Sequence, residues 1–400
     1  MNSPMNSRLD ISLYEEEIER YRVRRRLRRQ NTEKNLAASY RRRIVSVANR
    51  LPVTVSRDKE TGEYTFTMSS GGLVTAMKSL ADIEMLWIGW CGTEIPECDR
   101  EYVNERLRNE FNCTAVFLSC ELIEDYYNGF ANNILWPLFH YMLTPLADYD
   151  VNTMDKQWDA YKVANKLFAE TVVSVYQEHD LIWVHDYHLM LVPKYIRKRL
   201  KGKNDPQIGW FLHTPFPSSE IYRLLPFREV ILKGLLSSNL VGFHIVDYKR
   251  HFLNACSRIL GLNCTPEGVD NTGKLGFFCT VEVFPIGIEP KEFYEQMVVP
   301  EVESHLDELE RAFEGQMVIL GIDRLDYIKG IPNKLVAFEK FLATHPEFIG
   351  KVVLIQLAIP SRTQVEAYKQ LRKQTHEIVG RINGKYGRLG YIPIHHLDQS

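Results

Sequence analysis

The stretch from Leu181 to Arg223 decides the fold, and it reads LIWVHD (181–186), YHLMLVPKYIRKRL (187–200), QIGWFLH (207–213) and TPFPSSEIYR (214–223). The first and third segments are short apolar runs, typical of parallel strands that are buried on both faces. The segment between them has apolar residues at near-helical spacing and predicts a helix. The whole stretch therefore predicts a strand–helix–strand unit of an open α/β sheet.

Polar, titratable residues follow both predicted strands at their carboxyl ends. His185, Asp186 and His188 come after the first strand, and His213 ends the second. Open α/β sheets bind ligands at that edge. Two ordinary roles are equally open: Asp186 as the N-cap of the following helix, and His213 as a strand-end histidine bonded to the backbone. No cysteine and no zinc-like spacing accompanies these histidines, so we expect no metal site at this edge.

Length and composition bound the possibilities. Four hundred residues predict two or three domains, and 45% apolar with 25% charged residues is ordinary for a globular protein. Residues 1–43 carry 12 Lys/Arg and 6 Asp/Glu, a net of +6, which leaves −8 on the rest of the chain. An acidic body argues against general nucleic-acid binding. The basic extension over 1–43 is either a solvated tail or loosely packed helix, or a patch for nuclear import or an anionic partner.

Cysteine usage and hydropathy bear on the location of the chain. The seven cysteines form no Cys-x-x-Cys pair, which suits a reducing compartment. No run of about 18 apolar residues occurs, and the N-terminus lacks the apolar core of a secretory signal. We therefore expect a cytoplasmic protein without a membrane span.

Further strands and helices alternate along the chain. Before residue 290, we expect strands at 43–53, 63–68, 86–92, 114–119 and 239–244, and helices at 70–80, 99–111, 121–140, 155–177, 228–237 and 246–260. A second series has strands at 317–322 and 351–358 and helices at 301–313, 331–343 and 363–381. The Pro–Gly–Pro cluster ending at Pro290 predicts the domain crossing, which gives domains 44–290 and 291–400. Two strands make a meagre sheet, so the second domain is either small or truncated.

Three more features could contact a ligand. The pair Gly71–Gly72 precedes a predicted helix, where it either makes a tight turn or lets backbone N–H groups approach a phosphate. The aromatic residues of 126–141 form either core or a platform for a sugar ring. Arg324 and Lys329 lie between a strand and a helix and suit a diphosphate, although Arg324 could simply pair with Asp326 on the surface. Polar strand ends on two series predict a ligand cleft between the domains.

A set of motifs runs through the chain in a fixed order: ANRLPV, SSGGL, WIGWCG, YYNGFAN with LWPLFHY, WVHDYHL, FLHTPFPSSEIYR, VFPIGIEP, DRLDYIKG, PSR and GRINGKYG. From about Ile44 to the last residue, this set resembles the trehalose-6-phosphate synthases of glycosyltransferase family 20. The resemblance implies a GT-B fold, in which two Rossmann-like parallel-sheet domains face a cleft. It also implies transfer of glucose, with retention, from UDP-glucose to glucose 6-phosphate to give α,α-trehalose 6-phosphate and UDP, with no metal or other cofactor.

The same resemblance implies a role for each matching residue. The expected catalytic residues are Asp186, His213, Arg324 and Lys329. Those expected to bind glucose 6-phosphate are Arg50, Trp90, Tyr127, Trp136, Asp186 and Arg362. Those expected to bind UDP-glucose are Gly71, Gly72, His213, Arg324 and Lys329. His185 and His188 receive no role.

The family's second domain continues beyond the position that corresponds to Ser400, with acidic groups for the donor sugar and ribose. We therefore expect the second domain to be incomplete, the 400-residue chain alone to have little or no activity, and its open sheet edge to favour association. Two alternatives stay open: a non-catalytic regulatory subunit of a trehalose synthase complex that binds sugar phosphate, and a transferase of this fold with another acceptor such as a glucan. The expected ligands are a sugar phosphate and a nucleotide sugar, with neither nucleic acid nor membrane; a homo-oligomer or the subunits of such a complex are the protein partners to consider.

Overall fold

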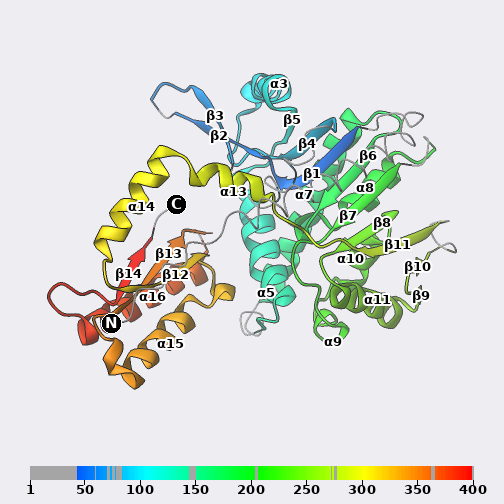
Figure 1. The fold of residues 1–400 in the computed structure, drawn as a ribbon. Coiled ribbons are helices and arrows are strands. Elements are labelled where there is room, and N and C mark those ends of the chain that lie inside the picture. The colour runs from blue at the N-terminus through cyan, green and yellow to red at the C-terminus, as the bar shows by residue number, and fades with distance from the viewer. Residues whose placement is uncertain are drawn as a thin grey trace, which may run out of the picture.

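The structure is a computed structural model, and it describes residues 43–58, 60–69, 73, 77, 83–143, 150–202, 206–271, 273, 277–361 and 365–398. Three of the sequence predictions lie outside these residues: the basic extension up to residue 42, the pair Gly71–Gly72, and Arg362. Figure 1 shows a large sheet on the right and a smaller one at the lower left.

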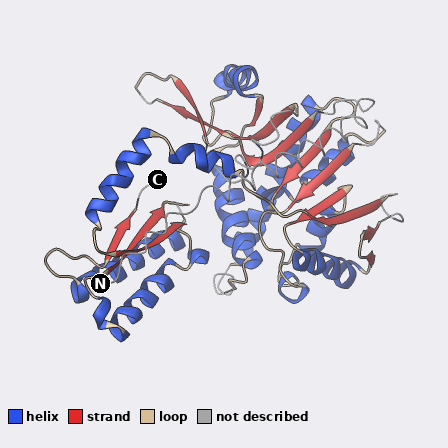
Figure 2. Ribbon diagram, in the orientation of Figure 1, coloured by secondary structure: helices blue, strands red, loops and turns tan. Residues whose placement is uncertain are grey.

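Nine strands form the large sheet in the order β5-β4-β1-β6-β7-β8-β11-β10-β9. They are β1 (Ile44–Arg50), β4 (Met85–Trp90), β5 (Cys113–Val116), β6 (Leu181–His185), β7 (Gln207–Phe211), β8 (Leu240–Phe243), β9 (Asn263–Thr265), β10 (Gly268–Asp270) and β11 (Phe278–Val283). All pairs from β5 to β11 are parallel, and β10 and β9 continue the sheet antiparallel. The chain adds strands on one side of β1 and then on the other, so the topological switch point lies between β1 and β6, which Figure 1 labels. Figure 2 draws the strands of this sheet in red, in the same orientation.

Helices and one hairpin accompany this sheet. The hairpin pairs β2 (Val53–Arg57) with β3 (Tyr64–Met68). The helices are η1 (Glu97–Asp99), α3 (Arg100–Phe111), α4 (Cys120–Ile123), η2 (Glu124–Leu135), α5 (Trp136–Phe139), α7 (Val151–Val175), η3 (Tyr187–Leu189), α8 (Val192–Arg199), α9 (Ser219–Tyr222), α10 (Arg228–Leu235) and α11 (Val246–Leu260). Most follow the apolar spacing read from the sequence. The helix predicted over 121–140 is instead three segments, of which the longest, η2, is a π-helix.

The central strand β6 is fully buried on one face and partly buried on the other. Ile182 and Val184 are fully buried in the main core, as the apolar run predicts. Leu181 and Trp183 point the other way and are half-buried, because that face borders a cavity of about 740 Å³. The face that carries Trp183 is therefore less completely buried than the apolar run predicts, although His185 on the same face is buried.

A second, smaller sheet follows, with its own core. It contains β12 (Met317–Arg324), β13 (Val352–Ile359) and β14 (Ile394–Leu397), parallel and adjacent in chain order. The helices of this part are α13 (Pro290–Met297), α14 (Pro300–Ala312), η4 (Tyr327–Lys329), α15 (Ile331–Thr344), η5 (Pro346–Phe348) and α16 (Glu366–Tyr386). The sequence does not predict the strand β14, because IHHL carries two histidines and no sustained apolar run.

We call residues 43–283 the first lobe and residues 317–398 the second lobe. Tyr327 packs against the buried clusters of both lobes, and Ile328 packs against that of the first. Between the lobes, α13 and α14 have no buried side chain among those described. The domain boundary at residue 290 therefore remains a prediction. None of the described helices is long and apolar enough to cross a membrane.

The edge of the second sheet at β12 predicts self-association. Leu320 and Ile322 are each 60% exposed on a strand that pairs only with β13 among the described strands. A lysine on such an edge opposes pairing with another strand because its charge would be desolvated. We expect the 400-residue chain to form larger species as its concentration rises, and Leu320→Lys to shift it towards monomer in sedimentation velocity.

The matched control is Val163→Lys, which makes the same change at a 45%-exposed position on α7. Equal behaviour of the two variants would contradict a role for the β12 edge.

Candidate active site at the topological switch point

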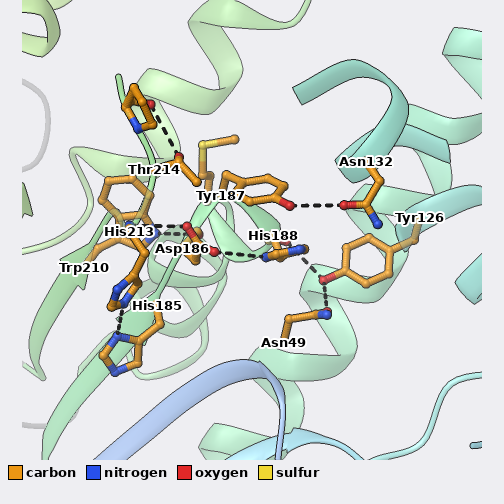
Figure 3. A network of polar contacts seen from close by, with 12 residues as sticks. Asn49, Tyr126, Asn132, His185, Asp186, Tyr187, His188, Trp210, His213 and Thr214 are labelled. Carbon is orange, nitrogen blue, oxygen red and sulfur yellow. Dashed lines mark hydrogen bonds and ion pairs between the residues drawn. The ribbon is translucent and has the colours of Figure 1, made fainter. Parts of the chain in front are cut away.

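The polar residues predicted at the strand ends come together where the strand order reverses. Asn49 lies near the end of β1, and Asp186 directly follows β6, its neighbour. Figure 3 shows Asn49, Asp186, His188 and His213 within one network of polar contacts. The carboxyl edge of the large sheet therefore holds the candidate site, as the sequence predicts.

The backbone of Asp186 is held in an unusual conformation. Its φ is +73° and its ψ 173°, a region that residues other than glycine rarely adopt. The Asp186 N–H donates to the carbonyl of Phe211 at 2.7 Å, and Trp210 Nε1 donates to the Asp186 carbonyl at 3.2 Å. These bonds to β7 hold the chain in a sharp turn, so that neighbouring polar side chains can point in different directions.

Asp186 is ionised and does not act as a helix cap. Its Oδ1 accepts from the backbone N–H of His213 at 3.3 Å, and its Oδ2 lies 3.6 Å from His188 Nδ1. No hydrogen bond from its side chain caps η3, so the N-cap interpretation is wrong. Burial by itself would raise the pKa of Asp186, but the contacts with His188 and His213 outweigh it and lower the pKa to about 2. The side chain, 22% exposed, presents a carboxylate acceptor at neutral pH.

Two histidines beside Asp186 share a hydrogen bond. His185 Nδ1 and His213 Nε2 are 3.1 Å apart, and both residues line the 740 Å³ cavity. Burial lowers the pKa of both rings, and the neighbouring His213 helps to bring that of His185 to about 3. Both imidazoles are therefore neutral at pH 7. The expectation that the His213 ring bonds only to backbone is wrong.

A row of rings leads from Asp186 to an exposed arginine. The guanidinium carbon of Arg50 lies 4.7 Å from the ring centroid of Trp90, which lies 6.2 Å from that of Tyr127. Tyr127 stacks on His188 with centroids 5.6 Å apart, and His188 faces Asp186. The structure thus brings together four of the residues predicted for the acceptor, and it adds His188, to which the sequence assigned no role.

The π-helix η2 supplies Tyr127 and separates it from its buried neighbours. Tyr126 and Phe130 are fully buried and Trp136 is 6% exposed, whereas Tyr127 is only partly buried. Trp136 is not part of the row itself; the centroid of its ring lies 5.8 Å from that of Tyr187, the residue before His188. Of the two interpretations of this aromatic cluster, core therefore describes most members, and a sugar platform remains open for Tyr127 and the exposed Tyr141.

Several supporting residues were missed in the sequence. The hydroxyl of Tyr161 donates to the Tyr187 carbonyl at 2.7 Å and accepts from the Met190 N–H at 3.0 Å. Asn165, one turn later on α7, donates to the His188 carbonyl and accepts from the Leu191 N–H. A polar pair spaced four apart within an apolar helix stripe was the available signal, because such a pair is buried only if it has partners.

The two cations predicted for the diphosphate lie on the second lobe. Arg324 ends β12 and Lys329 ends η4, and both side chains are exposed. Asp326 is buried and accepts from the Ile328 N–H and the Tyr368 hydroxyl, so a surface pair with Arg324 is the wrong description. Neither cation lines the cavity that His213 borders. In the segment between them, Tyr327 and Ile328 pack on the core of the first lobe.

The histidines around Asp186 do not form a metal-binding arrangement in the described part of the first lobe. Within the described residues, no group of three or more His, Cys, Asp or Glu side chains is arranged to hold a metal ion. The expected lack of a metal or cofactor remains a prediction. The roles predicted for Gly71, Gly72 and Arg362 do too, since these residues lie outside the described part of the chain.

Removing the Tyr161 hydroxyl should destabilise the first lobe. Tyr161→Phe leaves a buried carbonyl at Tyr187 and a buried N–H at Met190 without this partner, which costs about 1–3 kcal/mol. All six tryptophans precede residue 211, so fluorescence during urea unfolding reports on this lobe.

The control is Tyr102→Phe, whose hydroxyl lies on the exposed face of α3 and which should change stability by less than about 0.5 kcal/mol. A Tyr161→Phe midpoint equal to that of the control would show that the hydroxyl does not hold the turn after β6.

Known proteins match this chain over most of its length. Residues 42–400 match the profile of the family described as "Glycosyltransferase family 20". A trehalose-phosphate synthase [UDP-forming] of Botryotinia fuckeliana is 51% identical over 90% of this chain and 67% of its own length. The 56 kDa subunit of the corresponding Kluyveromyces lactis synthase is 49% identical over 89% of this chain and 72% of its own. The chain thus spans about two thirds to three quarters of the length of these relatives.

Solved structures with the same fold are similar over nearly the whole chain. The N-terminal domain of the Candida albicans trehalose-6-phosphate phosphatase has a TM-score of 0.77 at 31% identity, covering 90% of this chain and 72% of that one. The Escherichia coli protein bound with UDP-2-fluoro glucose has a TM-score of 0.74 at 32% identity, covering 90% of this chain and 74% of that one.

Proposed function

Because the chain belongs to glycosyltransferase family 20, we propose that it transfers glucose from UDP-glucose to glucose 6-phosphate, with retention, to give α,α-trehalose 6-phosphate and UDP. Its fold is GT-B, the fold of its solved structural relatives. The observation that carries the proposal is the row from Arg50 to Asp186, which places a guanidinium and a carboxylate at the two ends of a line of rings.

The acceptor side follows from the chemistry of that row. Arg50 offers a planar fork of N–H donors, which suits a phosphate. Asp186 is a pure acceptor at neutral pH and suits sugar hydroxyl groups. A ligand that satisfies both ends carries a phosphate on a polyhydroxylated ring, as glucose 6-phosphate does. This pairing favours a phosphorylated acceptor over a glucan.

The donor side combines neutral and cationic groups. His213 would contact the glucose of the donor, while Arg324 and Lys329 would stabilise the charge that develops on the diphosphate as UDP leaves. Double displacement needs a second carboxylate as nucleophile. No second carboxylate contacts Asp186 among the described residues. We therefore favour attack from the face of the leaving group, whose phosphate accepts the proton from the acceptor.

A regulatory subunit is the second candidate, and one comparison favours it. A phosphatase N-terminal domain has the same fold, so the fold alone does not specify a synthase. The identity of about 50% to synthases, against 31% to that domain, supports the enzyme. The name of the Kluyveromyces relative supports a protein complex as the setting. We place the chain in the cytoplasm, since its seven cysteines are all free thiols.

Two arginines should separate the ligands in calorimetric titrations of the 400-residue chain. Arg50→Ala should weaken glucose 6-phosphate at least tenfold and leave UDP unchanged, and Arg324→Ala should do the reverse. Each expectation follows from the loss of a charge-assisted hydrogen bond, about 1.5–3 kcal/mol, and tenfold corresponds to about 1.4 kcal/mol.

Each variant is the matched control for the other, because both remove one exposed guanidinium at the end of a strand. A wild-type chain that shows no heat with millimolar glucose 6-phosphate, or a variant that weakens both ligands equally, would rule out this division of the site.

A further inference from the structure

His185 is a buried residue whose imidazole is not part of the row from Arg50 to Asp186. It ends β6, is 1% exposed, and lines the cavity together with His213. Its Nδ1 is 3.1 Å from His213 Nε2. Its Nε2 is buried and has no hydrogen-bond partner among the described residues. One ring nitrogen of His185 thus has a hydrogen-bond partner and the other has none, and this asymmetry determines which nitrogen carries the proton.

A hydrogen bond between two neutral imidazoles needs one N–H and one lone pair. If His213 Nε2–H donated to His185 Nδ1, the single proton of His185 would sit on its Nε2, where no acceptor from the described residues lies within reach. If His185 Nδ1–H donated instead, only a lone pair would be left bare at Nε2. Orphaned buried N–H groups are rarer than orphaned acceptors, so the second arrangement is preferred.

The preferred arrangement fixes the proton of the second ring. A neutral His213 that accepts at Nε2 carries its hydrogen on Nδ1. No protein acceptor contacts that Nδ1 among the described residues, and the ring borders the cavity. The ring contacts around it are with Phe211 at 4.8 Å and His244 at 5.8 Å, measured between centroids. The polar atom that His213 has to offer is therefore a donor.

We propose that His185 is a positioning residue that fixes His213 in the Nδ1–H tautomer, so that His213 presents a hydrogen-bond donor to an oxygen of the sugar carried by the nucleotide. The proposal rests on the proposed function for the identity of that sugar, but the tautomer itself depends only on the two rings and on the buried, unpartnered Nε2 of His185. Asp186 and His213 follow the adjacent strands β6 and β7. In the proposed site, Asp186 accepts hydrogen bonds from the acceptor sugar, and the neutral His213 donates one to the donor sugar.

The tautomer can be measured without ligand. In the chain labelled with ¹⁵N-histidine, long-range ¹H–¹⁵N correlation separates ring nitrogens that carry a proton from those that do not. We expect His213 to show a protonated Nδ1 and a bare Nε2, and His185 to show a protonated Nδ1. The His213→Asn and His185→Asn spectra give the assignments. A His213 ring protonated at Nε2 would overturn the proposal whether or not the chain binds UDP-glucose.

Variants test the consequence. His185→Asn keeps an N–H donor near the position of Nδ1 and should retain the His213 tautomer, whereas His185→Leu should release it into a mixture. In titrations, the quantity to compare is the ratio of the affinity for UDP-glucose to the affinity for UDP. This ratio should fall about fivefold in His185→Leu, because about one neutral hydrogen bond to the sugar is lost. It should stay at the wild-type value in His185→Asn.

The control is His251→Asn, which removes a histidine bonded to the Phe216 carbonyl away from the cavity. Equal affinity ratios in His185→Leu and wild type would overturn the positioning role. If the wild-type chain shows the expected tautomer but no preference for UDP-glucose over UDP, the donor-sugar role assigned to His213 is the part that fails.

Discussion

The turn at Asp186 is the constraint on which the rest of the site depends. A positive φ at a residue with a side chain costs on the order of 1–3 kcal/mol, and it persists only where the surroundings hold it. The bond from Asp186 to Phe211 ties the turn to β7, and Tyr161 and Asn165 hold the segment that follows it. Because the backbone reverses at this point, His185 meets His213, Asp186 meets the His213 N–H, and His188 meets Tyr127. In an ordinary strand, successive side chains alternate between the two faces of the sheet, so the unusual backbone of Asp186 sets the direction of these three contacts.

Tight packing elsewhere keeps that turn in register with β1. Gly89 of β4 has no room for a side chain, because a Cβ there would lie 2.7 Å from the backbone nitrogen of Leu51. The close approach lets Trp90, the next residue, lie under Arg50. In η2, a Cβ at Gly129 would lie 2.5 Å from the side chain of Gln157 on α7, so the π-helix packs directly on the helix that carries Tyr161. The row from Arg50 to Asp186 and the turn are thus supported by the same helix.

The strands and their order of polar ends could be predicted from the sequence, because apolar runs of five or six residues ending in histidine or aspartate are a local signal. The geometry at Asp186 could not, because the same letters also describe a helix cap, and only the contact with β7 decides between them. The π-helix was hidden for a related reason, since its spacing is close to that of an α-helix over a few turns. No role for His185 could be predicted from the sequence, because the role depends on its hydrogen bond to His213, 28 residues later in the chain.

The charged residues of the candidate site differ in burial between the two lobes. In the first lobe, burial keeps the His185 and His213 rings neutral, and Asp186 is the anion of the network, stabilised by its neighbours. In the second lobe, Arg324 and Lys329 stay in solvent, so their charge carries no desolvation cost until a ligand covers them. The loop between them is nevertheless anchored at its centre, since Asp326 is buried and accepts a hydrogen bond from the Tyr368 hydroxyl. Tyr327, which packs on the buried clusters of both lobes, lies between the two cations in sequence, so the contact that joins the lobes comes from the same segment that carries the positive charge.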